Sequence, residues 1–174
     1  MAQLLYGRLC MKRIIALILA AVMLLTGCSS GKPLTPKEYS AALKNDSMEW
    51  SKDLMAVASL IPDDAEEGFL DTIKGNKSEA EKYFGELEKD FAAFESIVPP
   101  EDYAELHEKL LVGVKHERTW LQYIRQMFGA ENADDYKNAA DALEKHVDSI
   151  TENNESLPQA YYEIHMKFRN DGVE

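Results

Sequence analysis

Apolar residues recur every three or four positions over most of the chain after residue 34, which is the spacing of one face of an α-helix. Capping residues, glycines and prolines divide this pattern into four long predicted helices. The helices are expected over residues 35–62, 78–99, 100–129 and 132–154. Their apolar stripes are, in chain order, Tyr39, Leu43, Trp50, Leu54, Val57 and Ile61; Ala80, Phe84, Leu87, Phe91, Phe94 and Val98; Tyr103, His107, Leu110, Val114, Leu121, Ile124 and Phe128; and Tyr136, Ala140, Leu143, Val147 and Ile150.

Two further segments carry shorter apolar patterns. Residues 63–75 predict a short helix that Asp63 caps and Gly75–Asn76 closes. Residues 159–168 predict either a fifth short helix or a kinked continuation of the fourth.

No stretch of the chain alternates polar and apolar residues in the way of a half-buried strand. The links between the main predicted helices are mostly short, and short links make consecutive helices antiparallel neighbours. We therefore expect an all-α fold, an up-down antiparallel bundle of four long helices with one or two short extra helices. The bundle is expected over residues 35–170, with a frayed tail at 171–174.

The run MKRIIALILAAVMLLTGC at residues 11–28 differs from the rest of the chain. Lys12 and Arg13 give it a positive start, and an unbroken apolar segment from Ile14 to Leu25 follows. A membrane-spanning helix needs about 20 apolar residues, whereas roughly 10–14 is typical of the apolar region of a signal peptide. A plain secretory signal and an uncleaved anchor are the alternatives that this pattern leaves open.

The run closes with the sequence LTGC, which ends at Cys28 and resembles the lipobox of bacterial lipoprotein signal peptides. The resemblance implies that a diacylglyceryl group is attached to the Cys28 thiol and that residues 11–27 are cleaved off after Gly27. Each buried CH₂ group contributes about 0.8 kcal/mol, so two acyl chains would anchor the protein stably at the extracytoplasmic face of the cell membrane. Residues 28–34 are then a short polar tether.

The residues before the run fit the lipoprotein pattern poorly. We expect translation to begin at Met11 rather than at Met1, and an unusually long positive region is the alternative. Cys10 and Cys28 are the two cysteines of the chain, so lipidation of one and removal of the other would leave a mature domain without thiols. Thiol redox chemistry, cysteine nucleophiles and thiolate metal sites are thereby excluded from that domain.

The chain is acidic, with a formal net charge of −12 at pH 7. Arg8, Lys12 and Arg13 precede Cys28 and no acidic residue does, so processing would make the charge more negative still. This balance argues against binding to nucleic acid or to anionic lipid, both of which recruit Lys and Arg. Solubility in the space outside the membrane explains the charge, and the alternative is a site for cationic peptides or metal ions.

One short pattern, Pro-x2-Tyr-x3-His-x-Lys, occurs twice, which suggests a duplicated helical hairpin, with chance as the rival explanation. A duplication would place Tyr103 and His107 in positions equivalent to those of Tyr161 and His165. The pattern also resembles proline-initiated helices in small uncharacterised lipoproteins of Gram-positive bacteria, a resemblance that implies no activity. The two copies are Pro100, Tyr103, His107 and Lys109, and Pro158, Tyr161, His165 and Lys167.

Glu117 lies in the middle of the helix expected over residues 100–129. Both plausible registers of that helix place the residue on the inward face. A buried carboxylate is costly unless it is paired, so Glu117 marks either a site or a structural network. The alternative is a side chain that reaches out from the edge of the stripe or pairs with a neighbouring base. With His107 and His165, Glu117 is a candidate ligand-binding or buried polar residue.

Metal binding and catalysis lack a sequence signature. No two of the four histidines lie three or four residues apart, and H-E-x-x-H, G-x-S-x-G and phosphate-binding glycine loops are absent from the sequence. Haem could still be held between Met48 or Met55 and His146 or His165, as helical bundles permit. We expect no metal site and no resident cofactor.

The sequence thus favours a non-enzymatic binding or interaction module, tethered to the membrane through Cys28, with a protein partner at the cell surface. A helical bundle that binds a small ligand, a metal or haem is the alternative.

Overall fold

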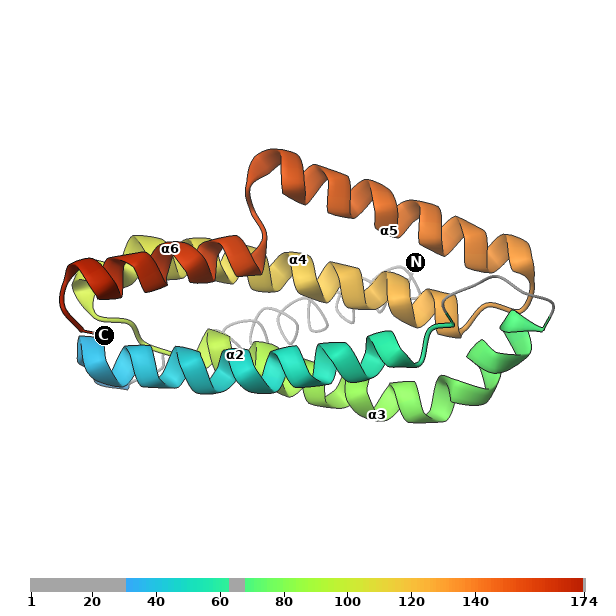
Figure 1. Cartoon of the computed structure of the whole chain (residues 1–174), viewed down its shortest axis with the longest axis horizontal. Helices are drawn as coiled ribbons and strands as arrows, with labels where there is room; N and C mark the ends of the chain where they lie inside the picture. The colour runs from blue at the N-terminus through green and yellow to red at the C-terminus, as the bar shows by residue number, and fades with distance from the viewer. Residues whose placement is uncertain (1–30, 63–67, 174) are drawn as a thin grey trace, which may run out of the picture. The chain divides into compact units, whose positions relative to one another are not determined.

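The computed structural model describes residues 31–62 and 68–173, and all of its helices belong to one compact unit that begins at Pro33 (Figure 1). These residues form helices and no strand, which confirms the prediction of an all-α bundle. The long helices are joined by short links. In chain order the elements are α2 (Pro36–Ser59), α3 (Phe69–Ser96), the 3₁₀ turn η1 (Glu101–Tyr103), α4 (Ala104–Phe128), α5 (Ala133–Asn153) and α6 (Leu157–Asn170).

Some predictions fall on residues that the structure does not describe. The lipoprotein-like run at residues 11–28, with Cys28, lies outside the described residues, as does the cap expected at Asp63. Within the described ranges, no helix is both long enough and apolar enough to cross a membrane.

Side-chain caps start three of the helices. At α2, Thr35 Oγ1 accepts a hydrogen bond from the Glu38 amide at 3.3 Å, and Glu38 Oε2 accepts one from the Thr35 amide at 2.8 Å. Such a reciprocal pair satisfies amides that the first turn of a helix leaves open. Asn132 caps α5 and Ser156 caps α6, and in each case the side-chain oxygen accepts one hydrogen bond from the backbone amide three residues later. Residues close in sequence make all of these caps.

The prediction that a short helix ends at Gly75–Asn76 is wrong, because α3 runs through these residues without a break. Ile73 and Ala80 are both fully buried on one stripe, so packing holds the helix together across the weak helix formers between them. The Asn76 side chain also donates a 2.9 Å hydrogen bond to the carbonyl oxygen of Leu60, near the end of α2. Tertiary contacts therefore override a local stop signal.

In the described residues, four long helices (α2, α3, α4 and α5) and the shorter α6 build the bundle. Helix α2 packs on α3, α3 packs on α4, and both α5 and α6 pack on α4. Helices α5 and α6 run in the same direction along α4, with α6 over its N-terminal half and α5 over its C-terminal half (Figure 1). The final segment is thus a separate helix rather than a kinked continuation, and Asn154 ends α5 in a left-handed conformation with φ 56°.

The core holds the stripes of α2, α3, α4 and α6. Its largest fully buried side chains include Tyr39, Phe84, Phe91, Tyr103 and Phe128. The stripe predicted for the fourth helix behaves differently, because Ala139 is the one buried residue that α5 contributes. Helix α5 packs mainly against a single neighbour, α4, so its apolar face is only partly covered.

Candidate functional site

Glu117 lies on the inward side of α4, one turn beyond Gly113 and one turn before Leu121, both of which are buried. The side chain is half-buried, and burial raises the pKa of its carboxyl group to about 7. It has no hydrogen bond or ion pair with any described residue. Glu117 is therefore a partly buried carboxylate to which the described residues supply no hydrogen-bond donor and no positive charge.

The break between α5 and α6 lies beside Glu117. Leu157, the first residue of α6, rests against Gly113, and Glu155 in the connection bonds to His116 at 3.1 Å. The turn between the two helices therefore crosses α4 next to Glu117. Helices α5 and α6 together take the place of a fourth bundle helix, and beside Glu117 that place is filled by the turn between them.

Trp50 of α2 occupies the same level. Tyr39 of α2 and His107 of α4 are hydrogen-bonded, and this contact aligns the two parallel helices. Trp50 comes 11 residues after Tyr39, and Arg118 comes 11 residues after His107. This register therefore places Trp50 level with Arg118, which is next to Glu117. The Trp50 Nε1 donor is buried without a hydrogen-bond partner. By this register, the unpartnered Trp50 donor lies at about the height of the half-buried Glu117 carboxylate.

His107 is a core residue rather than an open ligand. The Tyr39 hydroxyl and the His107 Nδ1 atom share a 2.9 Å hydrogen bond, and His107 Nε2 is buried without a partner. Burial lowers the pKa of the imidazole to about 4, so the ring is neutral near pH 7. Tyr39, Tyr103 and Phe168 surround one another edge-on or tilted at this end of the bundle.

The two copies of the Pro-Tyr-His-Lys pattern lie in different surroundings. Tyr103 is buried and donates a 2.7 Å hydrogen bond to Asp171, whereas Tyr161 is half-buried beside Trp50. His165 is half-buried on α6 and already takes part in an interaction, so it is not a free ligand side chain. The side chains are thus not in equivalent sites, although a duplicated origin stays a prediction.

Helices α4 and α5 bring together a pair of histidines that the sequence pattern does not predict. The rings of His116 and His146 lie 5.4 Å apart, and His146 Nε2 donates to the His116 carbonyl oxygen at 3.1 Å. His116 Nε2 lies 3.1 Å from Glu155 Oε2, and Tyr123 packs on His146. Residues so distant along the chain carry no local signal, since a spacing rule detects pairs within one helix only.

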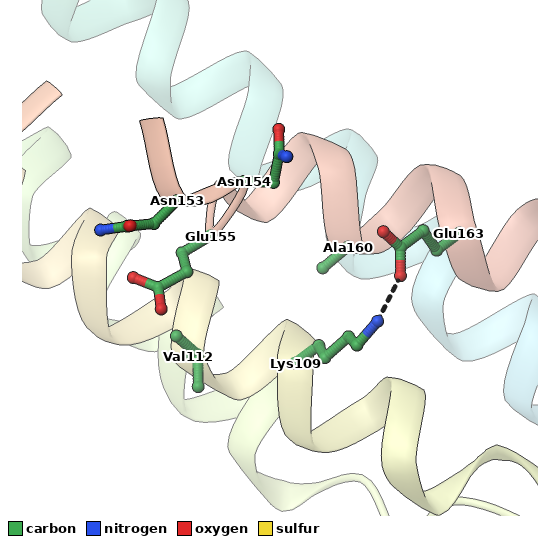
Figure 2. A pocket seen from close by; sticks show the side chains of 7 residues that line it. All are labelled: Lys109, Val112, Asn153, Asn154, Glu155, Ala160 and Glu163. Atoms are coloured by element: carbon green, nitrogen blue, oxygen red, sulfur yellow. Dashed lines mark hydrogen bonds and ion pairs between the residues drawn. The ribbon is translucent and has the colours of Figure 1, made fainter. Parts of the chain in front are cut away.

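A surface pocket of about 330 Å³ lies where the α5–α6 turn meets α4. Figure 2 shows Asn153 at the end of α5 and Asn154 and Glu155 of the turn on one side, with Lys109 and Glu163 joined by an ion pair on the other. The Lys109–Glu163 distance is 2.9 Å. The remaining lining residues are Val112 and Ala160. Amides, both signs of charge and the apolar side chains of Val112 and Ala160 give this solvent-open pocket a mixed lining.

The alternatives that involve metal or haem find little support in the geometry. In the part of the chain that the structure describes, no three His, Cys, Asp or Glu side chains converge as metal ligands. Met48 and Met55 are both exposed, with Met55 72% accessible, so neither thioether faces the core in which a haem would lie. His146 already bonds to a backbone carbonyl.

The fold and these sites define an all-α helical bundle with a few buried polar side chains in its core and a solvent-open pocket at a helix junction. No family model, no curated protein and no solved structure matches this chain. Function must therefore be argued from the residues themselves.

Proposed function

We propose that this protein is a membrane-anchored extracytoplasmic lipoprotein whose acidic bundle is a non-enzymatic module for binding a protein partner. The observation that carries the proposal is the incomplete burial of α5. The lipobox-like run ending at Cys28 supports the anchor. A short tether, residues 28–34, would keep the bundle and its partner close to the membrane, which raises their effective concentration.

Helix α5 is amphipathic, yet it buries one residue out of 21, Ala139. Val147 is 43% exposed, and Leu143 and Ile150 are half-buried on the same side of the helix. Apolar surface gains roughly 25 cal/mol for each Å² removed from water, so a partner that covers this face would gain the free energy that the bundle leaves unused.

The charges of α5 restrict the chemistry of that partner. Six acidic residues and two lysines share the helix, with the acids spread along its length: Asp134, Asp135, Asp141, Glu144, Asp148 and Glu152. A partner that packs on the apolar stripe meets these carboxylates at the rim. We therefore expect an amphipathic segment with a basic rim, since complementary rim charges steer association.

A second candidate function is the binding of a small polar ligand, which the pocket of Figure 2 favours. Its volume of about 330 Å³ lies at the lower end of the range for small-molecule sites, which is about 300–1,000 Å³. The Asn153 and Asn154 side chains offer both donors and acceptors there. Ligand-induced changes in the NMR signals of these two amides would test this function.

The experiment for the main proposal is site-specific photo-cross-linking in intact cells that express the full-length, membrane-bound protein. A photoreactive residue replaces Val147 in one variant and Met55 in the matched control, which is exposed on α2. We expect a discrete cross-linked product from position 147 and none from position 55. Absence of a product at 147, or the same products at both positions, would contradict the proposal.

A further inference from the structure

A cavity of about 190 Å³ lies between α2, α3 and the first turns of α6. It shares none of its lining residues with the pocket of Figure 2, and no residue of α5 lines it. Helix α6 packs chiefly on α4 and touches α2 only slightly, which leaves space between α6 and α2. The described lining residues are Ser47, Trp50, Ser51, Phe94, Leu157, Pro158 and Tyr161.

Three aromatic side chains line the cavity, one from each helix: Trp50, Phe94 and Tyr161. Within the described ranges, none of these rings stacks on another aromatic ring or meets one edge-on. Rings elsewhere in the core do pair, as Phe84 does with Phe128 at a centroid distance of 5.7 Å. Such pairs are favourable beyond the area that they bury. A planar ring inside the cavity would therefore meet three ring partners that the fold leaves unpaired.

The hydrogen-bond donor of Trp50 is unpaired as well. The side chain is 9% exposed, and its Nε1 atom is buried without a hydrogen-bond partner among the described residues. An indole N–H group donates and cannot accept, so only an acceptor satisfies it. A buried donor without an acceptor costs free energy, and a ligand that supplies the acceptor would recover that cost.

The remaining polarity of the cavity comes from hydroxyl groups. None of the described lining residues carries a charge, and an ion buried without a counter-charge is unfavourable. Ser47 Oγ donates a 3.0 Å hydrogen bond to the Lys44 carbonyl oxygen and can still accept one. The hydroxyl groups of Ser51 and Tyr161 have no hydrogen bond with any described residue. The lining therefore suits a neutral ligand that has both an acceptor and a donor.

We propose that this cavity binds a small neutral aromatic molecule with an amide-like substituent, its ring among Trp50, Phe94 and Tyr161 and its acceptor on Trp50 Nε1. An engineered cavity of about 150 Å³ holds benzene, so a volume of about 190 Å³ admits one ring with a short substituent. Larger, drug-sized ligands occupy about 300–1,000 Å³ and are too large for it.

This site does not depend on the function proposed above. Its probe is benzamide, which is neutral, planar and carries both an acceptor and a donor. The sample is the full-length lipidated protein in lipid nanodiscs, with isotope-labelled tryptophan. The chain has two tryptophans, so its NMR spectrum contains two indole N–H signals, and Trp120→Phe assigns them. We expect benzamide to shift the Trp50 signal downfield in about the millimolar range, because so small a ligand binds weakly, and to leave the Trp120 signal in place.

Substitutions in the cavity test the location of the site. Ser51→Leu fills part of the cavity from an exposed position of α2, and Ser59→Leu makes the same change at an exposed position outside it. We expect the first to weaken benzamide binding by about tenfold or more and the second by about twofold or less. Trp50→Phe keeps a ring but removes the donor, and it should weaken binding by about twofold to tenfold, as expected for one neutral hydrogen bond. The backbone amide signal of Tyr161 reports binding to that variant.

A second probe tests the role of the rings. Cyclohexanecarboxamide carries the same amide on a ring that is not planar, and it should bind at least about twofold more weakly than benzamide. The proposal is overturned if the Trp50 signal does not move up to the solubility limit of benzamide, or if the two amides bind equally. Equal binding of benzamide by the Ser51→Leu and Ser59→Leu proteins, or unchanged binding by Trp50→Phe, would overturn it too.

Discussion

Gly113 of α4 and Leu157 of α6 meet backbone to backbone, so closely that a Cβ atom on Gly113 would lie 2.6 Å from the Leu157 Cα atom. Real Cβ contacts of this length do not occur, so the contact requires glycine. It lies where the chain leaves α5 and begins α6. The position of α6 on α4 therefore depends on one missing methyl group.

Gly113→Ala is predicted to lower the free energy of unfolding by about 2–4 kcal/mol, because backbone at Leu157 has to move to admit the methyl group. Gly85→Ala is the matched control, since nothing lies within 4 Å of a Cβ at this exposed position of α3. The control is expected to raise stability by about 0.5–1 kcal/mol through its helix propensity. Urea denaturation measures both, and equal effects would contradict the close contact.

Tyr39→Phe is predicted to lower the free energy of unfolding by about 1–3 kcal/mol. The change removes the hydroxyl that bonds to His107 Nδ1 and leaves an imidazole with two buried, unpartnered nitrogens. Tyr162→Phe, at an exposed position of α6, is the control and should change stability by less than about 0.5 kcal/mol. If both variants unfold at the same denaturant concentration as the unmodified chain, the buried pair contributes nothing.

Glu117→Gln is predicted to stabilise the protein at high pH and to leave it unchanged at low pH. The pKa of Glu117 is raised from 4.5 to about 7 in the fold, so the unfolded chain releases this proton first and stability falls as the pH rises between these values. Above pH 7 the whole penalty is present, and the amide removes it. The expected gain is about 1–3 kcal/mol at pH 8 and none near pH 4.

Denaturation at several pH values tests this prediction, with Glu108→Gln, at an exposed position of the same helix, as the control. The difference in stability between Glu117→Gln and the unmodified chain should grow from pH 4 to pH 8, whereas that for the control should stay flat. Two parallel pH profiles would mean that Glu117 is not destabilised by burial.

Cys28→Ala is predicted to abolish membrane retention and to leave an unprocessed precursor, because the thiol is the expected attachment point of the lipid. Cell fractionation and intact-mass measurement would show both effects. Cys10→Ala is the control and should be retained and processed like the unmodified chain. A Cys28→Ala protein that fractionates and is processed normally would disprove the lipobox interpretation.

Sequence reasoning succeeded where the interacting residues are neighbours along the chain. Thr35 and Glu38 lie within one turn, so their reciprocal cap could be predicted from spacing alone. The inward position of Glu117 followed from helical periodicity, although its lack of a partner did not. Gly75–Asn76 was predicted as a stop because weak helix formers end isolated helices, but the burial of Ile73 and Ala80 outweighs that preference here.

The amino-acid sequence by itself determined the all-α class, the caps and the stripes that face the core, since these depend on contacts within about four residues. Tertiary structure alone decided that α5 packs mainly on α4, that His116 meets His146, and that Leu157 rests on Gly113. Each of these contacts joins separate helices, and helical periodicity says which side of a helix is apolar but not which neighbour covers it. That choice depends on the packing of whole helices, down to the methyl group that Gly113 lacks.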